Sequence, residues 1–141
     1  MKSRKIERED LLQLNLLFPE LYEPQIKEAI IEKGTWMEIK AGEMLMDIDQ
    51  YIKFMPLIMS GNLKVLREDN DGKELLIYHV AQGQTCAMAI TCCMGDARSN
   101  IRAVAEEDCT VIAIPTQVLD EWSSRFSSWK HFVFKSYQTR F

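Results

Sequence analysis

Hydrophobic residues recur with two different periods, and the changes of period divide the chain into three parts. Residues 7–17 predict a helix that ends before Pro19, because leucines recur at helical spacing at Leu11, Leu12, Leu14 and Leu17. Residues 24–33 predict a second short helix, since Pro24 suits a first helical turn and Gly34 suits the position after the last turn. The chain therefore begins with two helices.

From Thr35 the hydrophobic period becomes two, which is typical of strands. Turn-forming residues interrupt this pattern at short intervals, at Gly42, 47–50, Gly61 and 70–72. Asp71-Gly72 lies between the apolar runs 63–66 and 75–78 and predicts a β-hairpin. The middle of the chain therefore predicts an antiparallel barrel or sandwich.

The strand pattern lapses over residues 85–100 and resumes at Ile101, Ala103, Ala105, Val111 and Ala113. It ends at Pro115, and helical spacing then returns. One helix face carries Trp122, Phe126, Trp129 and Val133, and Phe132 and Tyr137 widen this stripe. Ser127 and Ser128 are suited to cap a new helix in the middle of this region.

Length and charge narrow the class of protein. The chain has 141 residues, which suits one domain, and 47% of them are hydrophobic. Its net charge is −4 and no basic stripe is present, so we expect this chain by itself to bind nucleic acid poorly. The longest apolar run, 54–59, is too short to span a membrane, and no secretion signal is present. We therefore expect a cytoplasmic protein with no membrane partner.

Four stretches together resemble the sensor domain of the Crp/Fnr family of transcription regulators. They are residues 41–45, residues 58–65, residues 71–75 followed by 82–84, and residues 107–115. The resemblance implies a mainly β fold with flanking helices: a double-stranded β-helix, or jelly-roll-like barrel, of the cyclic-nucleotide-binding type. It implies that residues 1–127 form this domain and that residues 128–141 begin a dimerisation helix.

In that family a DNA-binding helix-turn-helix follows the dimerisation helix. This chain ends at Phe141, so we expect a fragment that reaches DNA only through a missing C-terminal domain. The resemblance implies a homodimer that senses a small-molecule effector and has no catalytic function. The dimer helix is expected to leave apolar side chains exposed for a partner subunit, from Trp129, Phe132, Val133 and Tyr137.

The family's ligand is held by a glutamate and an arginine in a short cassette that follows a glycine. Counted from Gly83, the glutamate's place falls on Ala87. Strand parity counted back from Cys109 places Ser99 at the arginine's position, and Arg98 would need a one-residue bulge. A cyclic nucleotide is therefore not expected, and no cofactor is predicted apart from a small effector. The expected pocket comprises Gly83, Thr85, Cys86, Ala87, Met88, Ser99, Asn100 and Ile101.

The cysteines of this region have two interpretations. Cys86, Cys92 and Cys93 form a candidate thiol sensor, and a thiol at a helix start can have a lowered pKa. Alternatively they are small buried hydrophobic residues. If the segment is helical, Cys86 and Cys93 lie ~10 Å apart, beyond the ~7 Å limit for a disulfide. No metal site is predicted.

Two other functions remain open. A cupin-like enzyme has a similar barrel, but it needs a histidine-rich metal site, and this chain has only His79 and His131. A degenerate dimerisation domain that binds no ligand fits the same pattern.

Overall fold

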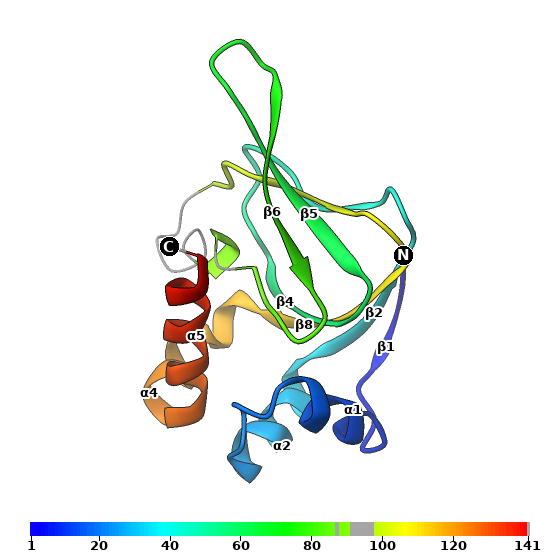
Figure 1. Cartoon of the computed structure of the whole chain (residues 1–141). Helices are drawn as coiled ribbons and strands as arrows, with labels where there is room; N and C mark the ends of the chain where they lie inside the picture. Colours follow the sequence, from blue (N-terminus) through cyan, green and yellow to red (C-terminus); the bar gives the residue numbers. More distant parts are fainter. Residues whose placement is uncertain (87, 91–97, 141) are drawn as a thin grey trace.

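The fold consists of two antiparallel four-stranded sheets with helices on one side (Figure 1). The computed structural model describes residues 1–86, 88–90 and 98–140. Residues 139 and 140 are described by their backbone alone. The first sheet has the order β1 (Lys2–Lys5), β2 (Thr35–Ile39), β8 (Cys109–Pro115) and β4 (Phe54–Ser60). The second has the order β3 (Met44–Met46), β7 (Arg102–Ala105), β5 (Asn62–Glu68) and β6 (Glu74–Ala81).

The prediction of a mainly β fold with flanking helices is confirmed, but the described strands do not form one closed barrel. An apolar core lies between the two sheets, with Ile39, Ile58 and Val111 from the first sheet and Leu63, Val65, Val80, Ala103 and Ala105 from the second. We call this the intersheet core. On β7, Ala103 and Ala105 are buried while Arg102 and Val104 are partly exposed, as strand parity predicts.

A second core lies between the first sheet and the helices. It contains apolar side chains of α1 (Asp10–Leu17), α2 (Pro24–Lys33), α4 (Leu119–Arg125) and α5 (Ser127–Arg140). Because β4 contributes to both cores, its five central residues from Met55 to Met59 are all buried. Pro56 fits in this strand because β4 is an edge strand of its sheet and a proline cannot donate a ladder hydrogen bond.

The predicted helices agree closely with the structure. α2 has the predicted bounds, whereas α1 begins at Asp10, three residues later than predicted. A short 3-10 turn, Thr116–Val118, leads into α4, and the chain becomes extended at Phe126 before α5 begins. This confirms the predicted break at Ser127. Among the described residues, no helix has the length and apolar character needed to cross a membrane.

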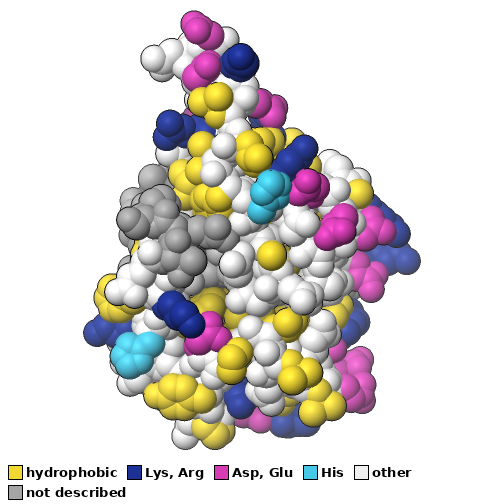
Figure 2. Space-filling view, in the orientation of Figure 1, with side chains coloured by type: hydrophobic (Ala, Val, Ile, Leu, Met, Phe, Trp, Pro, Cys, Tyr) yellow, Lys and Arg dark blue, Asp and Glu magenta, His cyan; other side chains and the backbone are white. Residues whose placement is uncertain are grey.

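The predicted hairpin joins β5 and β6 and projects beyond the rest of the molecule (Figure 1). Its turn is fastened by Asp69, whose carboxylate accepts the backbone N–H groups of Asp71 and Lys73, both at 2.9 Å. Hydrophobic side chains gather on the stem of the hairpin (Figure 2), where Leu75, Leu76 and Ile77 are exposed.

No hydrophobic pattern predicts β1, because its residues Lys2, Ser3, Arg4 and Lys5 are all polar, and all four are exposed in the structure. The strand forms by backbone pairing with the edge of β2, from Lys2 opposite Glu38 to Lys5 opposite Thr35. The Arg4 guanidinium lies 4.4 Å from the centre of the Trp36 ring, a cation–π contact that holds the strand in place.

Gly61 and Gly72 provide a matched test of this packing. Both have positive φ angles, +76° and +80°, so an alanine costs each about 1 kcal/mol from backbone strain. A Cβ on Gly61 would lie 2.5 Å from the carbonyl oxygen of Asp108, whereas one on Gly72 meets open space. We expect Gly61→Ala to reduce the free energy of unfolding by at least ~2 kcal/mol more than Gly72→Ala in urea denaturation. Equal losses would contradict this packing.

Candidate functional site

The segment that begins at Gly83 is held along the free edge of β4. The N–H of Gly83 donates to the carbonyl of Ile58 at 2.9 Å, and the N–H of Ile58 donates to the carbonyl of Gln84 at 3.0 Å. The hydroxyl of Thr85 donates to the carbonyl of Pro56 at 2.6 Å. Gly83 has a φ of +80°, which favours glycine. We call residues 83–85 the edge segment.

One group of predicted pocket residues follows the edge segment into the intersheet core. Cys86 and Ile101 are fully buried there, and Met88 packs against the core from a partly buried position. The hydroxyl of Tyr78 lies 3.5 Å from the sulfur of Cys86 and accepts the N–H of Met88 at 3.3 Å. Tyr78, which the sequence analysis did not single out, therefore joins β6 to the cassette.

Ser99 and Arg98 lie on opposite sides of the chain. Ser99 is 2% exposed, and its hydroxyl donates to the carbonyl of Ile101 at 2.7 Å and accepts the N–H of Ile101 at 3.1 Å. Arg98 is exposed, with its guanidinium 5.7 Å from the centre of the Tyr51 ring. Asn100 is also exposed. The burial of Ser99 therefore follows strand parity, and its hydroxyl is engaged by backbone next to it.

No charged side chain is buried among the residues that the structure describes. The buried polar side chains described are Thr85, Ser99 and Ser128. Arg102, on β7, points away from the intersheet core. Its guanidinium nitrogens lie 2.6 Å from a carboxylate oxygen of Glu74 and 3.1 Å from one of Asp47. Backbone N–H donation and this arginine hold the pKa of Asp47 below its usual range.

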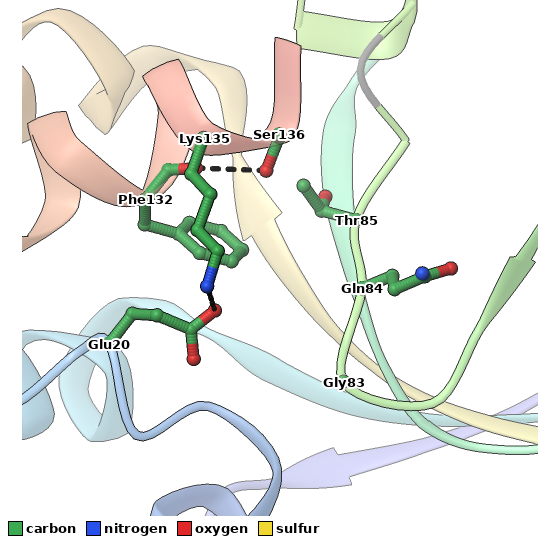
Figure 3. Close-up of a pocket in the computed structure, with 7 residues that line it drawn as sticks. All are labelled: Glu20, Gly83, Gln84, Thr85, Phe132, Lys135 and Ser136. Atoms are coloured by element: carbon green, nitrogen blue, oxygen red, sulfur yellow. Dashed lines mark hydrogen bonds and ion pairs between the residues drawn. The ribbon is translucent and has the colours of Figure 1, made fainter. Parts of the chain in front are cut away.

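The other side of the edge segment lines a groove of about 280 Å³ against α5 (Figure 3). Its walls come from three separate parts of the chain: Glu20, Gly83, Gln84, Thr85, Phe132, Lys135 and Ser136. We call it the α5 groove. Gly83 and Thr85 were predicted from the sequence as pocket residues and Phe132 as a dimer contact, whereas the other four residues were not predicted. No local spacing signals them, because α5 and the α1–α2 linker meet the edge segment only in the folded chain.

The structure corrects the predicted dimer face of α5. Trp129, Phe132 and Val133 are buried inside the single chain, and Tyr137 packs against the same core from a half-buried position. The Trp129 ring lies 5.0 Å from that of Trp122, and the Phe132 ring lies 5.7 Å from that of Phe18. These side chains are not exposed for a partner, because the α1–α2 linker and α4 already cover them.

The α1–α2 linker also holds α5 through charged groups. The carboxylate of Glu23 accepts the N–H of Ser128, in the first turn of α5, at 2.6 Å. This hydrogen bond lowers the pKa of Glu23 from its ordinary value. Further along the helix, the ammonium of Lys135 lies 3.8 Å from the carboxylate of Glu20.

The predicted thiol sensor is only partly described. Ala87, Cys92 and Cys93 lie outside the described residues, so their part in the pocket or the sensor stays a prediction. Cys86 is buried, as is Cys109. The thiol of Cys109 lies 3.1 Å from the carbonyl of Asn62 and donates to it, and burial raises the pKa of this thiol. Cys109 is therefore a packing residue of β8.

The sequence also matches a known family. The family model of the cyclic nucleotide-binding domain matches residues 36–125, most of the chain. The chain therefore belongs to the cyclic nucleotide-binding domain family. No curated protein matches the sequence significantly.

Solved structures with low sequence identity share the fold. A protein assigned to the crp/fnr family of transcriptional regulators from Eubacterium rectale is 18% identical, with a TM-score of 0.76 over 89% of this chain and 59% of that one. Catabolite activator protein from Thermus thermophilus is 16% identical, with a TM-score of 0.71 over 86% and 57%. The regulatory subunit of a cAMP-independent protein kinase A from Trypanosoma brucei is 14% identical, with a TM-score of 0.68 over 89% and 50%.

These comparisons confirm the resemblance to the Crp/Fnr sensor domain that the sequence motifs indicated. At these identities the structural likeness establishes the fold. The chain spans between half and three fifths of the length of these three structures.

The capping of α5 by Glu23 predicts a pH dependence of stability. A carboxylate whose pKa is lowered by folding stabilises the native state above its unfolded pKa of about 4.3, and this contribution is lost as the pH falls through the folded pKa. We therefore expect Glu23→Gln to lower the melting temperature at pH 7 and to differ less from the original protein as the pH approaches about 3. Circular dichroism melts across this range measure the difference.

Glu121→Gln is the control for this experiment. Glu121 pairs with Arg125 at 3.5 Å on an exposed helix face, where an ion pair contributes little. Its substitution is expected to leave the melting temperature nearly unchanged throughout. If Glu23→Gln lowers the melting temperature by the same amount at pH 7 and at about pH 3, the assigned role of the carboxylate is contradicted.

Proposed function

We propose that this chain is the effector-sensing domain of a Crp/Fnr-type transcription regulator and has no catalytic function. The observation that carries this proposal is the position of the edge segment between the intersheet core and α5. A ligand that favours one conformation of the cassette would shift that segment and, through it, α5. The family match and the regulators and kinase regulatory subunit of the same fold support a regulatory role over a cupin-like enzyme.

We infer that the effector is not a cyclic nucleotide. A buried cyclic phosphate needs a cation or several free hydrogen-bond donors, because an unpaired charge is costly away from water. The described side of the intersheet core is apolar, the Ser99 hydroxyl is engaged, and Arg98 is exposed. The same fold occurs in the regulatory subunit of a cAMP-independent protein kinase A from Trypanosoma brucei.

The alternative of a dimerisation domain that binds no ligand has one observation in its favour. The described part of the intersheet core is filled with packed apolar side chains, as in a purely structural domain. Under either function, DNA contact would belong to a further domain of a longer protein. The two functions differ in whether any small molecule raises the stability of the chain.

We further propose that α5 mediates a homodimer through its outer face. Because its aromatic stripe is buried inside the chain, the contact must use the opposite side of the helix, where Phe134 is 55% exposed beside exposed Lys130 and Gln138. This proposal replaces the predicted contact by Trp129 and Phe132. In a closed two-fold dimer both subunits use the same surface, and the outer face of α5 would pack against the same face of the partner's α5.

Titration with cyclic AMP tests the ligand class. We expect calorimetry to give a dissociation constant weaker than about 1 mM, because no described cation faces the intersheet core. Arg98→Ala should leave this weak binding unchanged, since Arg98 lies outside. A micromolar constant that Arg98→Ala abolishes would show that Arg98 is the phosphate-binding residue and would overturn the inference.

Sedimentation equilibrium tests the dimer. We expect a concentration-dependent dimer whose dissociation constant rises at least about tenfold in Phe134→Ala, because truncation removes apolar area that the interface would bury. Leu12→Ala is the matched control, since Leu12 is 75% exposed on α1, away from α5. If both variants dimerise as strongly as the original chain, or if the original chain stays monomeric at high concentration, α5 is not the interface.

A further inference from the structure

We propose that the α5 groove binds a small zwitterion of the size of a single amino acid. The site lies outside the intersheet core, on the far side of the edge segment (Figure 3). The inference rests on the proposed sensing function in one respect. A ligand in this groove would fix α5, the helix that carries the proposed signal, against the edge segment.

The charges of the groove select the class of ligand. The ammonium of Lys135 and the carboxylate of Glu20 point toward each other across the groove, with 3.8 Å between nitrogen and oxygen (Figure 3). An anion attracted by Lys135 also meets repulsion from Glu20, and a cation attracted by Glu20 meets repulsion from Lys135. A molecule that carries both charges can pair with both side chains. The site therefore favours a zwitterion over an anion such as a cyclic nucleotide.

The remaining walls fit the uncharged part of such a molecule. Phe132 supplies an apolar part of the lining beside the charged pair. The Ser136 hydroxyl donates to the carbonyl of Phe132 at 2.9 Å, which leaves its oxygen lone pairs able to accept an N–H from a ligand. Thr85 offers no free donor, because its hydroxyl is directed to Pro56.

The size of the groove limits the ligand further. Its volume of about 280 Å³ lies just below the ~300–1,000 Å³ range of small-molecule pockets. This volume suits a ligand as small as one amino acid. Gly83 belongs to the wall, and its Cβ would lie 3.0 Å from the carbonyl oxygen of Leu17, so the edge segment is already close to the end of α1.

Ligand binding at this site would replace the contact between Glu20 and Lys135 with a contact of the ligand to each of these side chains. The Glu20–Lys135 pair is long, and the Lys135 side chain is 65% exposed, so opening the pair costs little. A zwitterion would then pair with each side chain and connect the α1–α2 linker to α5 beside the edge segment. Binding would therefore stabilise the docked position of α5.

Calorimetry of the whole 141-residue chain with L-leucine, L-methionine and L-glutamine tests the proposal. We expect at least one of them to bind with a dissociation constant on the order of 1 mM or tighter. For leucine, 4-methylpentanoate lacks the ammonium group and isopentylamine lacks the carboxylate. Each single-charge analogue of a binding amino acid should bind at least about tenfold more weakly, because it leaves one wall charge unpaired.

Two variants and a matched control locate the site. Lys135→Met and Glu20→Gln should each weaken amino-acid binding at least about tenfold. Lys73→Met removes an exposed lysine from the turn between β5 and β6, outside the lining of the groove, and should leave binding unchanged. Circular dichroism establishes that each variant is folded.

The proposal is overturned if none of the three amino acids binds the folded chain, or if Lys135→Met binds them as tightly as Lys73→Met does. The cyclic AMP titration and the sedimentation of Phe134→Ala test the proposed sensing domain without using the groove. If no amino acid binds but the cyclic AMP titration and the sedimentation give the expected results, the groove proposal alone is rejected. If cyclic AMP binds tightly, the proposed effector class of the sensing domain is rejected, and the amino-acid titration still decides the groove proposal.

Discussion

Strand β4 is buried on both faces, and the other parts of the molecule are placed around it. Ile58 faces the intersheet core, while Met55, Leu57 and Met59 face the helices. One edge of β4 pairs with β8, and the other is closed by the backbone of the edge segment. A strand with no open face and no open edge cannot move without disturbing both cores, so it is a rigid reference for the elements that contact it.

The edge segment takes its importance from this fixed neighbour. Its inner side continues into Cys86 and the intersheet core, and its outer side forms a wall of the α5 groove. A few residues therefore separate the intersheet core from the helix that would carry a signal. Because the contacts of Thr85 and Gly83 with β4 fix the start of this segment, a change in the cassette must be absorbed further along it or passed to α5.

The docking of α5 shows how one hydrophobic stripe can serve two different structures. Trp129 and Phe132 have the spacing of an interface, and a helix presenting them to a second subunit would bury the same apolar area. Inside this chain they meet Trp122 and Phe18, and Glu23 caps the first turn. The outer face, with Phe134, is left as the surface available to a partner.

The features that depend on neighbours along the chain could be predicted from the amino-acid sequence. The bounds of α2, the break before Ser127, the hairpin at Asp71-Gly72 and the inward side of β7 all follow from local period and turn chemistry. The surface that covers each stripe depends on the folded chain, because those contacts join residues far apart in sequence. Glu23 and Ser128, which fix α5, are 105 positions apart, and β1 forms by pairing with the edge of β2 and by the contact between Arg4 and Trp36. The α5 groove is of the same kind, since three separate segments meet there and no local pattern records their meeting.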